Sequence, residues 1–337
     1  MLDPEQNNGF LDHYLDVPVD LSKVLFVCTA NTLDTIPGPL LDRMEIIRLS
    51  GYIEEEKVQI AQNYLVPLAL KNCGLKPEQI EVGDDVIRAL IHSYCRESGV
   101  RNLQKHVDKI YRKVAFKIVK EGGDQKVVVT KENLKDYVGN PIFISERTYE
   151  NNPTGVITGL AWTAMGGSTL YIESAVDKAA TGKNGLFRTG QLGDVMNESA
   201  SIAYTFAKSF VKEADPNNTF FESSSIHMHV PDGATKKDGP SAGITMTSSL
   251  LSLALGRAPA RDVAMTGEIT LLGKVLRIGG VKEKVIAAKR SGIKDIIIPA
   301  GNKADWDELE DYIKAGLTVH LVENYKDVYP IIFPPVA

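Results

Sequence analysis

The sequence lacks any uncharged apolar run near the roughly 18 residues that a membrane-spanning helix needs, and it lacks an excess of basic charge. Its 38 Lys and Arg residues are outnumbered by 43 Asp and Glu residues, which gives a net charge of −5. Proteins dedicated to nucleic-acid binding usually carry a basic face. The composition therefore favours neither a membrane protein nor such a binder.

Cysteine is also scarce, with only Cys28, Cys73 and Cys95, which form no C-x-x-C pair. This excludes a cysteine zinc site or a disulfide framework and fits a reducing compartment. The acidic, polar start MLDPEQNNGF has no signal-peptide pattern. We expect the chain to begin inside a domain, because its first apolar strand pattern, Val24–Thr29, has no earlier strand and helix to pair with.

The patterning divides the 337 residues into three parts. Residues 1–50 contain the Val24–Thr29 pattern, which lacks polar alternation and is typical of a strand buried on both faces of a parallel sheet. Residues 51–139 carry apolar residues at helical spacing, with Gly74 after one expected helix, and predict a small helical domain. After an Asn- and Pro-rich stretch, alternating strand and helix patterns predict an α/β (α+β) domain over 140–337.

One short motif raises a question of chemistry. Gly239-Pro240-Ser241-Ala242-Gly243 fits G-x-S-x-G, the nucleophile elbow of α/β-hydrolases. That elbow needs a buried strand running into the serine, yet residues 234–238 are polar. Only His320 follows as a histidine, although Asp295 completes a triad on paper. An esterase of this kind is therefore a minor alternative.

The simplest interpretation makes Ser241 the N-cap of the helix that follows it. This role is compatible with catalysis, because the backbone N–H groups at a helix start can stabilise an oxyanion. A serine nucleophile also needs a base. His227 and His229 alternate in a strand pattern and share one face, but no third metal ligand of suitable spacing follows, so packing is the more common role for such a pair.

A lysine is the other candidate base, provided that burial lowers its pKa. On a helix from residue 281, the apolar face is defined by Val281, Val285 and Ala288, and Lys284 lies about 65° from its centre. Lys282 and Lys289 lie farther round and are expected in solvent. The alternative is that Lys284 only extends along the helix surface. Two S-x-x-K matches, Ser209…Lys212 and Ser291…Lys294, lack the companion motifs of penicillin-binding enzymes.

Longer strings give these residues a context. They are GLAWTAMGGSTLYIES (159–174), GDVMNESA (193–200), HMHVPDGATKKDGPSAG (227–243), AMTGEITLLGKVLRIGGVKEK (264–284) and AAKRSGIKDIIIPAGNK (287–303). Together they cover almost all of 140–330, and the chain resembles the Lon family of ATP-dependent proteases, most closely its mitochondrial members. DGPSAG followed by MTGE and GGxKEK is far more specific than G-x-S-x-G alone.

The resemblance implies a Ser–Lys dyad, with Ser241 as nucleophile and Lys284 as general base. Thr266 corresponds to a hydroxyl that orients the lysine, and Asp238 to a loop acid whose position differs between active and inactive forms. Three further residues match residues lining the family's site: His227, His229 and Glu173.

The resemblance also identifies the N-terminal parts as the end of an AAA+ module: a remnant of its α/β subdomain, then the all-α lid. Asn31 matches the sensor-1 residue, Arg43 the arginine finger and Arg101 sensor 2. From the residues alone, these three read as a turn asparagine and two surface arginines.

One departure from the family concerns the nucleotide. No G-x-x-x-x-G-K-[ST] and no acidic Walker-B strand is present, so ATP and Mg²⁺ are expected as cofactors of the full-length enzyme and none of this fragment. The resemblance implies unfolded or damaged proteins as substrates, a homohexamer, and the mitochondrial matrix, with a bacterial-type cytoplasm as the alternative. Nucleic-acid binding follows only by analogy with mitochondrial members. A catalytically silent assembly module is the alternative function.

Overall fold

The computed structural model describes residues 3–30, 33, 35–47, 49, 51–95, 97–122, 126–143, 148–163, 166–177, 185–231 and 237–335. The chain forms two compact units, Met1–Leu49 and Ser50–Ala337. No helix in these described ranges is both long and apolar enough to cross a membrane.

The first unit contains little regular structure. A 3₁₀ helix, η1 (Pro4–Gly9), precedes an antiparallel hairpin of β1 (Phe10–Asp12) and β2 (Val17–Val19), and a short helix, α1 (Gly38–Leu41), follows. The strand expected at Val24–Thr29 was predicted wrongly, since these residues form no strand and Leu25 is 87% exposed. A strand inside a parallel sheet needs neighbouring strands to pair with, and no strand among the described residues pairs with Val24–Thr29.

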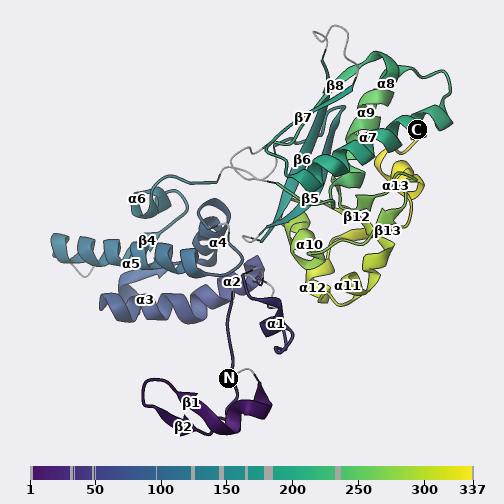
Figure 1. Ribbon diagram of the computed structural model, residues 1–337. Coiled ribbons are helices and arrows are strands. Elements are labelled where there is room, and N and C mark those ends of the chain that lie inside the picture. Colours follow the sequence, from purple (N-terminus) through teal and green to yellow (C-terminus); the bar gives the residue numbers. More distant parts are fainter. Residues whose placement is uncertain are drawn as a thin grey trace. The chain divides into compact units, whose positions relative to one another are not determined.

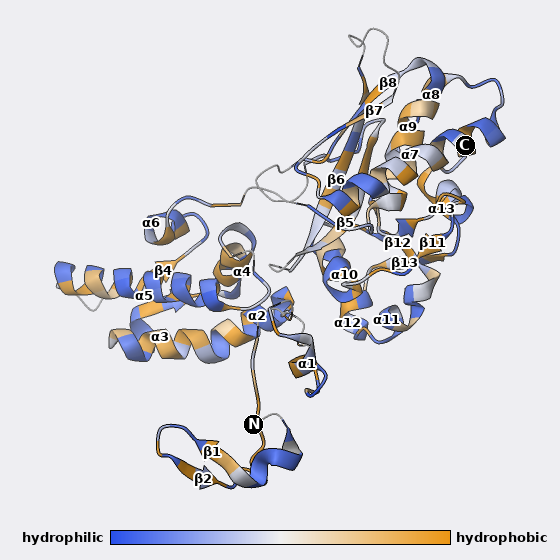
Figure 2. Cartoon of the chain, in the orientation of Figure 1, coloured by the Kyte–Doolittle hydropathy of each residue, from blue (hydrophilic) through white to orange (hydrophobic). Residues whose placement is uncertain are grey.

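The second unit begins with the expected helical region. It contains α2 (Glu54–Ile60), a π-helical turn η2 (Ala61–Leu65), α3 (Val66–Cys73), η3 (Pro77–Gln79), α4 (Asp84–Ser93), α5 (Arg101–Glu121) and α6 (Leu134–Val138). Gly74 ends α3 in a left-handed conformation, as the sequence predicted. Figure 2 shows α5 alternating between hydrophobic and hydrophilic residues, which agrees with its burial of one face. A short parallel pair, β3 (Ile80–Val82) with β4 (Val127–Val129), was not predicted.

The rest of the second unit is built on a seven-stranded mixed sheet in the order β13-β12-β9-β5-β6-β8-β7 (Figure 1). Its strands are β5 (Val156–Thr163), β6 (Gly166–Val176), β7 (Gly185–Thr189), β8 (Ser225–His229), β9 (Val263–Met265), β12 (Asp295–Pro299) and β13 (Thr318–Val322). β6 runs antiparallel to β5 and β8, whereas the other neighbouring pairs are parallel. A small hairpin of β10 (Glu268–Ile269) and β11 (Val275–Leu276) follows β9.

Helices cover both faces of this sheet, as expected for an α/β domain. One core unites the sheet with α7 (Asp194–Ala214), α9 (Gly243–Leu255) and α13 (Tyr325–Ile332), and α8 (Phe220–Ser223) precedes β8. The other core unites the opposite face with α10 (Val281–Arg290), α11 (Lys303–Asp307) and α12 (Asp311–Lys314), with η4 (Ala300–Asn302) between β12 and α11. Helices from opposite faces therefore approach the residues that follow β9.

Candidate active site

Ser241 lies in the turn immediately before α9. The prediction that it caps this helix was wrong, because the N-cap is Ala242 and no side chain caps α9. Instead, the carbonyl oxygen of Ser241 accepts hydrogen bonds from the Gly267 amide at 2.8 Å and the Thr266 hydroxyl at 3.1 Å. Ser241 is thereby bound to the segment directly after β9.

Glycine is required at the two ends of the G-P-S-A-G motif for different physical reasons. Gly239 has a φ of 119°, which residues with a side chain rarely adopt. A Cβ on Gly243 would lie 2.8 Å from the Ile269 amide nitrogen, so a side chain there would push α9 away from β10. G-P-S-A-G thus describes a tight turn packed against a hairpin rather than a hydrolase elbow.

Lys284 lies on the first turns of α10 and is only 3% exposed. Its burial agrees with its position near the apolar face of the helical wheel, since Val285 and Ala288 are also buried. Lys289 is exposed, as predicted, whereas the Lys282 side chain is only 27% exposed and pairs with Glu310 at 3.7 Å, so it is less solvated than predicted. Burial removes water from the ammonium group and lowers the pKa of Lys284 to about 8. A substantial fraction of this lysine is therefore neutral near pH 8 and able to accept a proton.

Thr266 connects the two residues. Its hydroxyl is fully buried, accepts a hydrogen bond from Lys284 Nζ at 3.1 Å and donates one to the Ser241 carbonyl at 3.1 Å. The structure gives no hydrogen bond directly between the Ser241 hydroxyl and Lys284, both of which are described. Lys284 is thus held beside Ser241 through Thr266.

The turn also presents unused backbone donors. The amides of Ser241 and Ala242 donate to no acceptor within the described part of the chain, whereas the next two amides bond to Pro240 and Gly267. Two adjacent free N–H groups at the start of a helix have the arrangement that stabilises a negatively charged oxygen.

Asp238 lies three residues before Ser241 and faces α7 rather than Lys284. Its carboxylate Oδ1 accepts hydrogen bonds from the Met196 amide at 3.0 Å and the Gly239 amide at 2.9 Å. The loop acid is therefore bound to the N-terminus of α7 in this structure.

His227, His229 and Glu173 form a second polar group on the sheet. The two histidines share one face of β8, as predicted, and Thr189 Oγ1 lies 2.8 Å from His227 Nε2 and 2.7 Å from His229 Nδ1. Glu173 pairs with His229 across β6 and β8 and accepts a hydrogen bond from the Tyr149 hydroxyl at 2.8 Å. None of the three side chains is hydrogen-bonded to Ser241 or Lys284, and no described cluster of three such groups is placed to hold a metal ion.

Two of the three residues that the esterase alternative needs lie together. His320 Nε2 lies 2.8 Å from Asp295 Oδ1, so these two residues do pair. Asp295 is the first residue of β12 and lies opposite Val263, the first residue of β9. Ser241 is instead bound to the residues that follow the last residue of β9. The pair and the serine therefore lie toward opposite ends of parallel strands, which argues against a triad.

The residues related to nucleotide binding are only partly described. Asn31 lies outside the described residues. Arg43, in the first unit, pairs with Asp3 at 3.2 Å, and Arg101 is the exposed first residue of α5 in the second unit. Glu97 caps that helix by accepting hydrogen bonds from the Asn102 and Leu103 amides.

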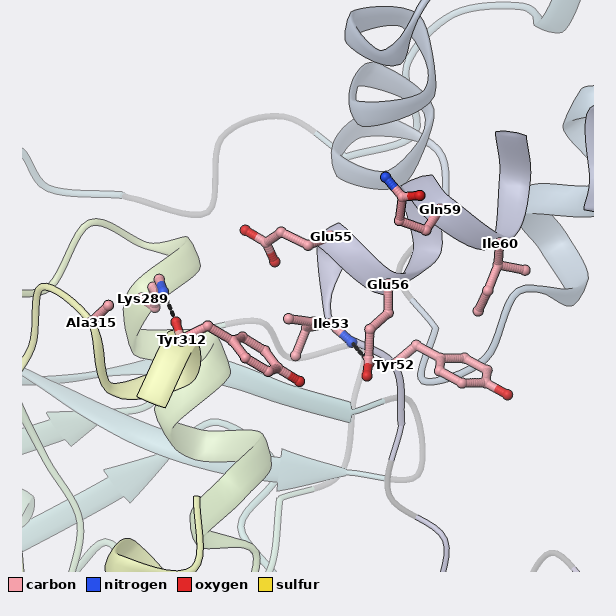
Figure 3. Close-up of a pocket in the computed structure, with 9 residues that line it drawn as sticks. All are labelled: Tyr52, Ile53, Glu55, Glu56, Gln59, Ile60, Lys289, Tyr312 and Ala315. Carbon is pink, nitrogen blue, oxygen red and sulfur yellow. Dashed lines mark hydrogen bonds between the residues drawn. The ribbon is translucent and has the colours of Figure 1, made fainter. Parts of the chain in front are cut away.

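A pocket of about 790 Å³ lies elsewhere in the second unit, as Figure 3 shows. It is lined by Tyr52 and residues of α2 on one side and by Lys289 and Tyr312 on the other, and Lys289 donates a hydrogen bond to the Tyr312 carbonyl. None of Ser241, Thr266 and Lys284 lines it, so it is separate from the candidate dyad.

Gly167 is a site residue that the sequence reasoning missed. A Cβ on this β6 residue would lie 1.9 Å from the carbonyl oxygen of Glu283, the neighbour of Lys284. Only glycine allows α10 to lie this close to the sheet. A glycine in a strand is a general signal for close backbone approach, but the sequence does not say which helix approaches.

On the dyad that the family resemblance implies, Gly167→Ala is expected to lower kcat for peptide cleavage by about 10- to 100-fold, because a displacement of α10 by about 1 Å moves Lys284 away from Ser241. Overpacking should also lower the unfolding free energy by about 1–3 kcal/mol. Steady-state cleavage and thermal unfolding test this, and wild-type kcat in the variant would contradict it.

The chain is similar in sequence to known proteins. A family profile described as the Lon protease (S16) C-terminal proteolytic domain matches residues 128–334, and one described as the Lon protease AAA+ ATPase lid domain matches residues 71–127. "Lon protease homolog, mitochondrial" of Ostreococcus lucimarinus is 60% identical over 333 residues, covering 98% of this chain and 36% of that protein. Proteins of the same name from Mus musculus and Homo sapiens are 58% and 57% identical over 340 residues, each covering 99% of this chain and 36% and 35% of those proteins. The chain thus spans about a third of the length of these curated relatives.

Proposed function

The chain belongs to the Lon protease (S16) family, and on that premise we propose that it cleaves peptide bonds with Ser241 as nucleophile and Lys284 as general base. The observation that carries the proposal is the buried Lys284, bound to a threonine that is itself bound to the serine's carbonyl group.

In the proposed reaction, neutral Lys284 takes the proton of the Ser241 hydroxyl as the oxygen attacks the substrate carbonyl. The free amides of Ser241 and Ala242 stabilise the oxyanion. Collapse of this intermediate expels the amine, which takes its proton from the Lys284 ammonium group, and leaves an acyl-enzyme with Lys284 neutral again. Water then attacks the ester as Lys284 accepts its proton, and the lysine returns that proton to the Ser241 oxygen when the acid product leaves. Thr266 keeps the lysine amine in place throughout.

Cleavage of a fluorogenic peptide tests the proposal, with Ser241→Ala measuring the background. His320→Ala is the matched control for the esterase alternative: it should cleave within about twofold of wild type, because the His320–Asp295 pair lies toward the opposite end of the strands from Ser241. Loss of cleavage in His320→Ala, or equal cleavage by wild type and Ser241→Ala, would reject the proposed assignment.

A second candidate, a catalytically silent assembly module, is favoured by the lack of a direct Ser241–Lys284 hydrogen bond. Catalytic hydrogen bonds are often long or poorly aligned in unliganded enzymes and tighten with substrate, so this observation weighs less than the buried base. Identical, zero cleavage by wild type and Ser241→Ala would favour the silent module.

We further propose that this chain is part of a longer ATP-dependent endopeptidase that acts on damaged or unfolded proteins as a homohexamer. The chain matches 36% of the Ostreococcus relative, which supports a longer protein, and the match of residues 71–127 to an AAA+ ATPase lid domain supports ATP dependence. The names of the relatives support a mitochondrial location, and the substrates and the homohexamer rest on the family resemblance. The division into an AAA+ remnant (1–50), a lid (51–139) and a proteolytic domain (140–337) is part of the same proposal.

The described residues do not fit a magnesium–nucleotide site of their own. The sequence has no phosphate-binding G-x-x-x-x-G-K-[ST] loop, and no group of three or more His, Cys, Asp or Glu side chains among the described residues is placed to hold a metal ion. Arg43, which the family resemblance assigns to nucleotide contact, is paired with Asp3. We therefore assign ATP and Mg²⁺ binding to the remainder of the longer protein.

Accordingly, the isolated chain is expected to bind ATP weakly or not at all. Lysine and backbone amides of the phosphate loop supply most of the contacts to the β- and γ-phosphates, and this loop is not in the sequence. Isothermal titration with Mg-ATP should show no heat of micromolar binding. A micromolar dissociation constant would contradict the expectation.

A further inference from the structure

We infer that Gly193, the residue before α7, positions the nucleophile by leaving the space in which Asp238 docks on that helix. The inference rests on the proposed function, because it assigns a positioning role for the same serine. It concerns the nucleophile loop, defined here as residues 237–241.

The Asp238 side chain caps the N-terminus of α7, because the N-cap residue of this helix has no side chain to do so. The N-cap position of α7 is Gly193, which has no side chain, and no side-chain cap bond comes from it. Asp238 Oδ1 instead accepts a hydrogen bond from Met196 at 3.0 Å, the third residue of the helix. A carboxylate at this point satisfies an otherwise unpaired N–H group and interacts favourably with the positive end of the helix dipole.

Space, rather than backbone conformation, requires glycine at position 193. Its φ of −72° and ψ of 174° are open to any residue. A Cβ there, however, would lie 2.2 Å from Asp238 Cγ and 2.3 Å and 2.6 Å from the two carboxylate oxygens. A methyl group at residue 193 and a docked carboxylate at residue 238 therefore exclude one another.

Further hydrogen bonds join the nucleophile loop to the same part of α7. The Gly193 amide donates to the Lys237 carbonyl at 2.7 Å, and the Lys237 amide donates to the Gln191 carbonyl at 3.2 Å. The Ser199 hydroxyl donates to the Pro240 carbonyl at 3.3 Å.

The loop is thus held at both ends. Its first residues are bound to α7, and Ser241 is bound through its carbonyl group to Thr266 and Gly267. Because only two residues separate Asp238 from Ser241, displacing the carboxylate changes the direction from which the loop reaches the serine. The position of the Ser241 hydroxyl relative to Lys284 then changes.

A double-mutant cycle in the full chain tests this inference. Gly193→Ala should lower kcat for a fluorogenic peptide at least tenfold with little change in KM. In an Asp238→Ala background, the same substitution should have little further effect, because no carboxylate is left to displace. Gly9→Ala, where a Cβ also meets nothing within 4 Å, is the control for adding a methyl group at a glycine without a close neighbour and should keep wild-type kcat. Equal losses from Gly193→Ala in both backgrounds, or no loss in either, would overturn the inference.

A second comparison does not depend on whether Gly193→Ala folds. Asp238→Asn keeps an oxygen acceptor for the Met196 amide, so it should retain several-fold more activity than Asp238→Ala. Equal losses in these two variants would overturn the docking role. If cleavage depends on Ser241 but the effects of the Gly193 and Asp238 substitutions are additive, only the positioning role of Gly193 is rejected. If wild type cleaves no faster than Ser241→Ala, the proposed function is rejected as well.

Discussion

Lys284→Met is expected to reduce peptide cleavage at least about a thousandfold while making the folded protein more stable. Methionine fills a similar volume but cannot accept a proton, and general-base catalysis contributes about 10²- to 10⁴-fold. Ser241→Ala should lose a comparable factor. Because residues that act as a unit are not additive, the double variant should be no slower than either single variant.

The gain in stability follows from the burial of Lys284. Its pKa is about 8 in the folded protein against 10.5 for the ordinary side chain, which corresponds to about 3 kcal/mol. Between pH 8 and pH 10.5 Lys284 is protonated in the unfolded chain and neutral in the folded protein. The unfolding free energy of wild type therefore rises with pH over this range. Below pH 8 the protonated Lys284 carries its full desolvation cost, which Lys284→Met removes. The variant also loses the hydrogen bond to Thr266, which reduces the gain in unfolding free energy by about 1 kcal/mol.

Chemical denaturation at pH 7 and the fluorogenic peptide assay measure the two effects together. We expect the Lys284→Met unfolding free energy to exceed that of wild type by about 1–2 kcal/mol, with the difference fading above pH 10. The dyad assignment would be wrong if the variant kept cleavage within tenfold of wild type. Lower stability at pH 7 would contradict the burial argument.

The second large effect concerns pH. With Lys284 as base, kcat/KM should rise about tenfold per pH unit below pH 8 and level off above it, since only the neutral amine accepts the serine proton. Between pH 6 and pH 8 the rise should be roughly 50-fold. A peptide without titratable groups in this range isolates the enzyme's contribution.

Glu283→Gln provides a matched variant for the profile. The Glu283 charge raises the pKa of Lys284 against the larger effect of burial, so its removal should move the midpoint to lower pH. A flat profile from pH 6 to 8, or a midpoint near the ordinary histidine value of about 6.5, would contradict the lysine assignment.

Local sequence pattern gave a preference for Lys284 and was insufficient for Ser241. The positions of Val281, Val285 and Ala288 define one helical face and place Lys284 nearer to it than Lys282 or Lys289, but a lysine that extends along the helix surface fits the same pattern. The burial of Lys284 follows from the structure. Ser241 was placed correctly before a helix but wrongly as its cap. The turn is set by Gly243 against β10 and by the bonds to Thr266 and Gly267, and these contacts join residues far apart in the sequence.

The same limit explains the other gaps. Glycines at positions 167 and 193 signal close packing, but their partners, Glu283 and Asp238, follow only from the three-dimensional fold. The strand predicted at Val24–Thr29 failed for a related reason, since strand formation depends on neighbours that a local hydrophobic pattern cannot supply. The shared face of His227 and His229 follows from strand alternation, whereas their contact with Thr189 does not.

The titration of Lys284 itself tests the central claim most directly, namely that a buried, readily neutralised lysine activates Ser241. NMR of the protein with isotope-labelled lysine side chains, compared with Lys284→Met, identifies its signal and follows it with pH. We predict a midpoint near pH 8 that coincides with the midpoint of the kcat/KM profile. A Lys284 signal that titrates near 10.4, the ordinary lysine value, would contradict the account.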